Sequence, residues 1–173
     1  MGGNMWNNVV TGVFNTFIKN DISCLRFNFR AVGGSNGEHG DGEEERTDVK
    51  ACIKFLIEER NNKKIFICGY SYGAAIGCSV VNAFDKIIGY AAISFPWAFM
   101  GSTFKERAQT DKPKLFIQGD KDNIAHYNHF EKNYNFYEEP KKFHIVKGAD
   151  HFYVGYEIKV ATYVLVFYKS LIS

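Results

Sequence analysis

The sequence predicts an α/β protein with a mostly parallel sheet and helices on both faces. Strand-like and helix-like patterns alternate along the whole chain, which is typical of βαβ units with right-handed crossovers. Residues 64–68 are almost wholly apolar, as expected for a strand of a parallel sheet that is buried on both faces. The length of 173 residues and the 46% hydrophobic content suit one core. We therefore expect residues 1–173 to form a single domain.

Two elements are predicted before the first glycine-rich loop. Apolar residues between Trp6 and Ile18 recur at the spacing of one helix face, and Asn4 precedes them as a candidate N-cap. Residues 23–30 (SCLRFNFR) follow, with Phe27 and Phe29 on one face. We expect this segment to be a strand.

The next elements lead to a tight turn. Five glycines fall within residues 31–42, which predicts a loop. Glutamates at 43–45 suit a helix N-terminus, and this helix ends before the strand at 64–68. Residues 69–73 then form a turn.

The second half repeats the alternation of strand and helix. Further strands are expected at 87–94, 114–119 and 141–146, and helices at 74–82, 124–138 and 155–171. No repeat or linker interrupts this order. Residues 95–111 are too few for a lid domain, so any site at this edge of the sheet should be open.

Charge and composition exclude several classes of partner. The net charge is +2 without a basic stripe, which argues against a nucleic-acid partner. No apolar run reaches the roughly 18 residues of a membrane span, and the N-terminus lacks the pattern of a secretory signal. We therefore expect a cytoplasmic protein without a membrane partner, and the sequence leaves its oligomeric state open. Four cysteines lie in apolar elements and are expected to be reduced core residues: Cys24, Cys52, Cys68 and Cys78.

The turn at residues 69–73 reads Gly-Tyr-Ser-Tyr-Gly and matches the G-x-S-x-G motif. It lies between a buried strand and a helix, where a sharp turn exposes its serine. Glycines at 69 and 73 are expected to let the two backbones pass. Ser71 is the candidate nucleophile, and the backbone N–H of Tyr72 is a candidate oxyanion donor.

A serine hydroxyl needs a base and an orienting acid, which follow the nucleophile in the order acid, then histidine. Asp122 follows the strand at 114–119, and His151 follows the strand at 141–146. Asp122 is preferred to Asp120 because it lies further into the loop. The remaining histidines fit this order less well: His39, His126, His129 and His144.

Several segments together resemble the small, lidless α/β-hydrolases related to dienelactone hydrolases. Besides the serine motif, the segments that carry the resemblance are Gly2-Gly3-Asn4-Met5, residues 25–33 (LRFNFRAVG), Ile93-Ser94-Phe95-Pro96-Trp97 and residues 112–116 (KPKLF). The resemblance implies the α/β-hydrolase fold with Ser71 as nucleophile, His151 as general base and acid, and Asp122 orienting the imidazole. Ala31 and Gly34 depart from the residues that are common in the family.

The leading hypothesis is a serine hydrolase that cleaves an ester, thioester or related acyl bond of a small molecule. It needs no metal or organic cofactor, and His151→Ala should lower turnover by several powers of ten. Phe95 and Trp97, with Phe99, are candidates to line the substrate site, although they would equally suit a core. The alternative is a catalytically impaired hydrolase-fold protein that acts as a binding module. A dinucleotide-binding domain fits poorly, because residues 33–37 are not G-x-G-x-x-G.

The resemblance also raises an expectation about the N-terminus. Family members carry further strands and a loop before the Gly-Gly-Asn-Met segment, and one of those strands lies between the strands equivalent to 23–30 and 64–68. We therefore expect the chain as given to lack the N-terminal strands of the fold and to be marginally stable and poorly active. Gly2 and Gly3 are the residues that could supply the second oxyanion donor.

Overall fold

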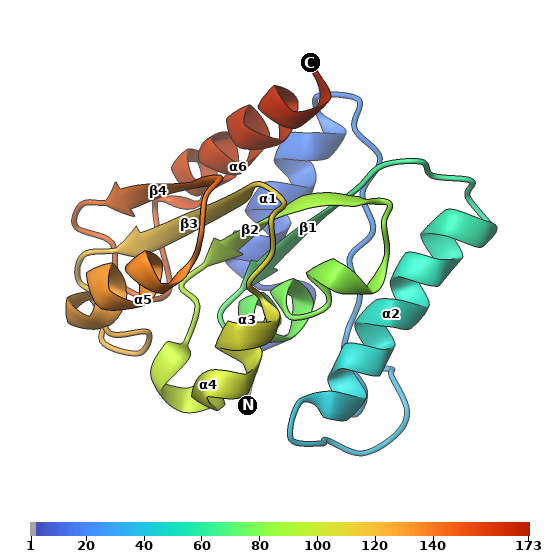
Figure 1. The fold of residues 1–173 in the computed structure, drawn as a ribbon, viewed down its shortest axis with the longest axis horizontal. Coiled ribbons are helices and arrows are strands. Elements are labelled where there is room, and N and C mark those ends of the chain that lie inside the picture. The colour runs from blue at the N-terminus through green and yellow to red at the C-terminus, as the bar shows by residue number, and fades with distance from the viewer. Residues whose placement is uncertain (1–2) are drawn as a thin grey trace.

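A four-stranded sheet is the centre of the computed structural model, which describes residues 3–173 (Figure 1). The strand order is β1-β2-β3-β4, and each neighbouring pair is parallel. The strands are β1 (Ile65–Tyr70), β2 (Ile87–Ile93), β3 (Lys114–Gly119) and β4 (Lys141–Val146). The α/β arrangement expected from the sequence is confirmed.

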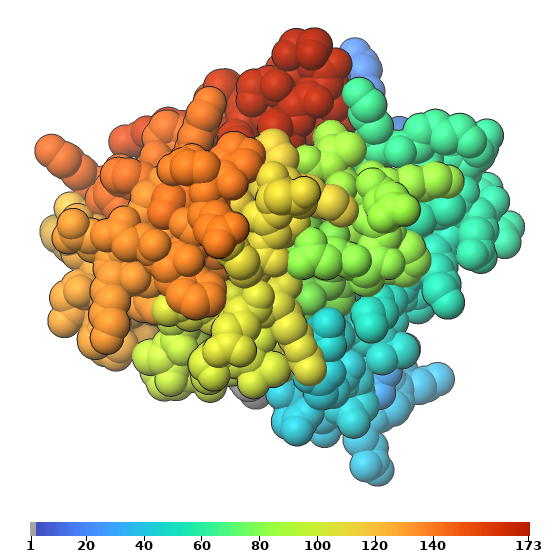
Figure 2. Space-filling view, in the orientation of Figure 1, coloured from blue at the N-terminus to red at the C-terminus, as the bar shows by residue number. Residues whose placement is uncertain are grey.

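Helices cover both faces of this sheet and enclose two apolar clusters. The α-helices are α1 (Asn8–Ile18), α2 (Glu43–Glu58), α3 (Tyr72–Cys78), α4 (Trp97–Arg107), α5 (Phe130–Phe136) and α6 (Glu157–Ile172). Helices α3, α4 and α5 lie on one face, and α1 and α6 pack together on the other (Figure 1). In Figure 2 the residues of α4 and α5, in yellow and orange, lie on the near side of the molecule. Two short 3-10 helices, η1 (Val81–Ala83) and η2 (Tyr127–His129), complete the order.

Helix α1 begins later than the sequence suggested. Asn7 is the N-cap, and its side chain accepts hydrogen bonds from the N–H groups of Val9 (2.9 Å) and Val10 (3.5 Å). Asn4, the expected cap, instead accepts the Trp6 N–H at 2.8 Å and closes a turn before the helix. The expectation was wrong because Trp6 was counted as the first residue of the helix, whereas the cap is the asparagine whose side chain reaches the second and third helical N–H groups.

Residues 23–30 do not form a strand, which corrects the sequence prediction. No backbone hydrogen bond joins this segment to β1 in the part of the chain that the structure describes, so β1 is an edge of the sheet. Side chains hold the segment instead. Asn28 Oδ1 accepts the Met5 N–H at 2.7 Å, and the Arg30 guanidinium pairs with Asp48 at 2.7 Å. The apolar alternation predicted which rings face the core, but it could not supply a hydrogen-bonded neighbour.

Two further elements differ from the prediction. Helix α4 was not predicted, and Gly101 (φ 69°) interrupts its helical path. The helix expected over residues 124–138 is confined to η2 and α5. The cysteines are all free thiols, of which only Cys78 is fully buried and Cys68 is exposed. Between residues 3 and 173, no helix is both long and apolar enough to cross a membrane.

Candidate active site

The carboxyl ends of the four parallel strands bring the candidate residues together at one edge of the sheet. Ser71 directly follows β1, and Ser94 directly follows β2. Asp122 lies in the loop after β3, and His151 lies in the loop after β4. Each strand therefore delivers one polar side chain to the same place, although the four residues are far apart in the sequence.

Ser71 lies on a strained turn between β1 and α3. Its backbone is in the left-handed region (φ 53°, ψ −123°), which L-residues rarely adopt. A β-carbon at Gly69 would overlap the backbone of Gly73 and Ala74, so only glycine fits there. At Gly73 a β-carbon would meet open space, so the close approach of the two backbones requires glycine at position 69 but not at position 73.

A continuous chain of hydrogen bonds links the three predicted side chains. Ser71 Oγ lies 2.9 Å from His151 Nε2, and His151 Nδ1 lies 2.9 Å from Asp122 Oδ2 and 3.1 Å from Asp122 Oδ1. His151 is 5% exposed and Asp122 is 2% exposed. Because a carboxylate only accepts, the proton on the imidazole lies on Nδ1 and leaves Nε2 free to accept from the serine.

The surroundings of Asp122 favour its ionised form. Burial alone would raise the pKa of this carboxyl, but hydrogen bonds from His151, Ser94 and the Ala125 N–H outweigh burial and hold the pKa below its usual value. Asp120, the other candidate acid, does not reach His151. Its Oδ1 accepts the Gly148 N–H at 2.6 Å and joins the loops after β3 and β4.

Tyr70 is a neighbour of the site that the sequence did not single out. Its hydroxyl donates to the His151 carbonyl at 2.7 Å, and its ring lies 5.4 Å from the imidazole. Burial raises the pKa of Tyr70 well above its usual value, so the phenol stays protonated and remains a donor. Tyr70 occupies a variable position of the G-x-S-x-G motif. Only its place at the end of β1 could have indicated its contact with His151.

Tyr72 and Gly3, the two candidates to donate to the oxyanion, have different surroundings. The Tyr72 N–H is in the first turn of α3 and has no hydrogen-bond partner within residues 3–173. Gly3 is exposed and has open space around its α-carbon. Gly2 lies outside the described residues.

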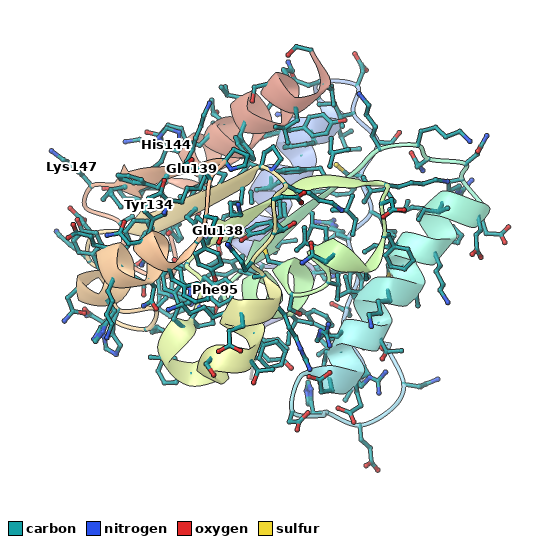
Figure 3. The ribbon with its side chains drawn as sticks, viewed as in Figure 1. Phe95, Tyr134, Glu138, Glu139, His144 and Lys147 are labelled. Atoms are coloured by element: carbon teal, nitrogen blue, oxygen red, sulfur yellow. The ribbon has the colours of Figure 1, made fainter. Side chains whose placement is uncertain are left out.

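The aromatic residues after β2 are buried rather than exposed to a site. Phe95 is 1% exposed, stacks on Trp97 at 5.2 Å, and lies among the side chains between the sheet and the helices of the near face (Figure 3). Trp97 is 9% exposed and donates its indole N–H to the Tyr137 hydroxyl at 3.2 Å. The expectation that Phe95 and Trp97 line the substrate site is corrected here, because Phe95 lies in the core and Trp97 lines a separate cavity with His129 and not the one beside Tyr72.

Phe99 remains at the surface beside the serine turn. A cavity of about 160 Å³ adjoins it, and Tyr72, the residue after the nucleophile, forms part of its wall. The other lining residues are Gly40, Asp41, Met100 and Phe104. The glycine-rich loop before α2 and the first half of α4 thus meet next to the serine turn.

The other histidines occupy different places. His39 lies 3.6 Å from the buried Glu45 carboxylate, and His126 and His129 lie near each other before α5. His144 is on β4 (Figure 3), and its ring stacks on that of Tyr163 of α6 with 3.9 Å between the ring centroids. Residues 3–173 contain no group of three or more histidine, cysteine or acidic side chains that could hold a metal ion.

Comparison with known proteins finds one family model and several related proteins that match this chain. A family model described as an alpha/beta hydrolase domain matches residues 1–162. An uncharacterized protein of Rickettsia prowazekii is 32% identical over 158 residues. This match covers 87% of the chain but 66% of the relative, so the chain spans slightly less than two thirds of that protein.

Two solved structures are also similar. One is an alpha-beta serine hydrolase homologue from Coxiella burnetii, with 28% identity and a TM-score of 0.87 over 95% of this chain and 78% of that one. The other is a serine hydrolase without a lid from Xanthomonas campestris, with 25% identity and a TM-score of 0.85 over 98% of this chain and 76% of that one.

Proposed function

Because the chain belongs to the alpha/beta hydrolase domain family, we propose that it is a serine hydrolase that cleaves an ester, thioester or related acyl bond. The observation that carries this proposal is the directed chain of hydrogen bonds from Ser71 through His151 to Asp122, with 2.9 Å at each step. In water a serine hydroxyl is a weak nucleophile, and this arrangement provides the base that activates it.

The first half of the reaction forms an acyl-enzyme. Ser71 Oγ attacks the carbonyl carbon of the substrate while His151 Nε2 takes the hydroxyl proton. The ionised Asp122 stabilises the imidazolium that results and keeps the proton on Nδ1. The Tyr72 N–H donates to the oxyanion as it forms. His151 then returns its proton to the leaving group, and the carbon–heteroatom bond breaks.

The second half releases the acid and restores the enzyme. Water replaces the leaving group, and His151 takes a proton from it as the water attacks the acyl carbonyl. The tetrahedral intermediate collapses, the Ser71 ester bond breaks, and the serine regains its proton. No step requires a group other than water and the residues of this chain.

The cavity beside Tyr72 has room for a small part of the substrate, such as a short acyl or alcohol group. Its volume of about 160 Å³ is below the roughly 300–1,000 Å³ that is usual for drug-sized ligands. Phe99, Met100 and Phe104 give it apolar walls. We propose that this cavity receives an apolar part of the substrate next to the bond that is cleaved.

A fluorophosphonate probe tests the proposed chemistry directly. Such a probe phosphorylates a serine that a neighbouring base activates, and it should modify Ser71 with one label per chain. Mass spectrometry of the labelled peptide identifies the residue. The positive assay is then turnover of p-nitrophenyl esters and acyl-CoA thioesters of increasing chain length.

Two controls make the result decisive. Ser71→Ala should lose all labelling, whereas Ser79→Ala should keep it, because the Ser79 hydroxyl bonds to the Ile76 carbonyl, away from the site. Absence of label on the folded native protein would contradict the proposal.

A further inference from the structure

Beyond the three side chains of the proposed mechanism, two buried hydroxyls form a chain that ends on Asp122, at the oxygen that also lies nearer to His151. Ser94 Oγ donates to Asp122 Oδ2 at 2.7 Å. The Tyr153 hydroxyl lies 2.8 Å from Ser94 Oγ. Both residues are 0% exposed, so solvent does not reach the contacts between them.

The donors and acceptors fix the direction of this relay. An ionised carboxylate has no proton, so Ser94 must donate its single hydroxyl proton to Asp122. Ser94 Oγ can then only accept in its second contact, and the phenol of Tyr153 is the donor. Burial raises the pKa of Tyr153 well above its usual value, which keeps this phenol protonated. The proton order therefore runs from Tyr153 to Ser94 to Asp122.

Both residues hold this geometry in an unfavourable backbone conformation. Ser94 has φ 49° and Tyr153 has φ 52°, in the left-handed region that favours glycine. Ser94 is also fixed by its N–H, which donates to the Ile117 carbonyl of β3 at 2.8 Å. A purely structural turn at this position would be easier to build with glycine, which has no hydroxyl.

We propose that Ser94 and Tyr153 are positioning residues that hold the Asp122 carboxylate in the orientation needed to accept from His151. Asp122 Oδ1 is held by the N–H groups of Ile124 (2.9 Å) and Ala125 (2.8 Å), and Ser94 supplies the corresponding contact on Oδ2. With donors on both oxygens, the carboxylate cannot rotate about its Cβ–Cγ bond. This inference rests on the proposed hydrolase function.

The test compares three variants in the full chain. Ser94→Ala and Ser94→Gly both remove the hydroxyl, but glycine also relieves the strained backbone. We expect both to lower kcat by about 10-fold to 100-fold, by analogy with the loss on removing a hydrogen-bond partner of a metal-ligating residue, with KM close to native. Tyr153→Phe should lower kcat less, because Ser94 remains but its hydroxyl is no longer oriented.

Proton NMR gives a readout that does not depend on turnover. The proton shared by His151 Nδ1 and Asp122 should resonate far downfield in the native protein and exchange slowly with water. We expect both Ser94 variants to shift this resonance and to speed its exchange. If the protein proves inactive, this measurement still decides whether Ser94 orients Asp122, so the two proposals can fail separately.

Matched controls separate positioning from simple loss of packing. Ser79→Ala removes a buried hydroxyl that donates to the Ile76 carbonyl and accepts from Arg46, and Tyr90→Phe removes one that donates to the Ala108 carbonyl. Neither hydroxyl contacts Asp122, so both variants should leave kcat and the resonance unchanged. The inference is overturned if both Ser94 variants keep native kcat and a native resonance. It is also overturned if Ser94→Gly restores the activity that Ser94→Ala loses, because backbone strain would then explain the effect.

Discussion

Asp120 and Asp122 lie two residues apart on one loop, yet they contact different groups. Only Asp122 accepts from the imidazole of His151, whereas Asp120 accepts the Gly148 N–H and ties two loops together. Sequence order alone had favoured Asp122 because it lies further into the loop. The difference allows the two carboxylates to be tested separately.

Asp122→Asn should lower kcat by about 10⁴-fold, the loss that a wrong imidazole tautomer causes in serine hydrolysis. The amide Nδ2 would donate toward His151 Nδ1, so the imidazole proton would move to Nε2, where it opposes the Ser71 hydroxyl. Steady-state kinetics on a p-nitrophenyl ester measure the loss. Asp120→Asn should stay near native, and equal losses in the two variants would contradict the assignment.

At the scale of elements, the free edge of β1 has the most direct consequence. Ile65 N–H donates to the Lys86 carbonyl and Ser71 N–H donates to the Ile93 carbonyl, so the odd-numbered amides of this strand point toward β2. Because amides alternate along a strand, those of Phe66, Cys68 and Tyr70 point toward residues 23–30. Within the described residues, these three amides have no backbone partner.

Amide hydrogen exchange measures this asymmetry. The amides of Phe66, Cys68 and Tyr70 should exchange markedly faster than those of Ile67 and Gly69 on the same strand, because exchange follows the opening of hydrogen bonds. Strand β3, which has a neighbour on each side, is the internal reference. Equal protection of the odd and even amides of β1 would mean that another strand pairs with this edge in solution.

At the scale of the whole molecule, several carboxyls are more acidic in the folded chain than in model peptides. The pKa is lowered for Asp48 and Glu45, against the effect of burial, by hydrogen bonds from Arg30 and from backbone N–H groups respectively. Asp122 behaves in the same way. In the unfolded chain these carboxyls have pKa values of about 4, and at a pH above this value they stabilise the folded state. This stabilisation is lost as the pH falls through the lower pKa values of the folded state.

The free energy of unfolding should therefore decrease as the pH is lowered from about 5 to about 3. Urea unfolding at a series of pH values measures it, and Asp48→Asn should flatten the dependence, because the variant has lost one of the shifted groups. The Asp48 carboxylate bonds to Arg30 and to none of the three candidate catalytic side chains, so the same variant should keep its fluorophosphonate labelling. A native curve that is flat over this range would contradict the prediction.

The sequence by itself determined the class of fold and the identity of the candidate residues. The apolar run at residues 64–68 correctly indicated a strand, β1, but this strand is at the edge of the sheet and its burial alternates, so the expected burial on both faces was wrong. The G-x-S-x-G motif marked a strand-to-helix turn because a close backbone approach excludes side chains at Gly69. The order of serine, acid and histidine then led to Asp122 and His151. These are local or topological properties, which spacing along the chain can encode.

Only the tertiary structure decided which groups actually meet. Residues 23–30 have the alternation of a strand but no hydrogen-bonded neighbour, and pairing between distant segments is not encoded in local sequence. Phe95 and Trp97 became part of the core because the chain after β2 packs these rings against the sheet, and the sequence had allowed either outcome. The contact of Ser94 with Asp122 joins the ends of two different strands. Parallel strands bring such distant residues to one edge, so their contacts depend on the register of the sheet rather than on any motif.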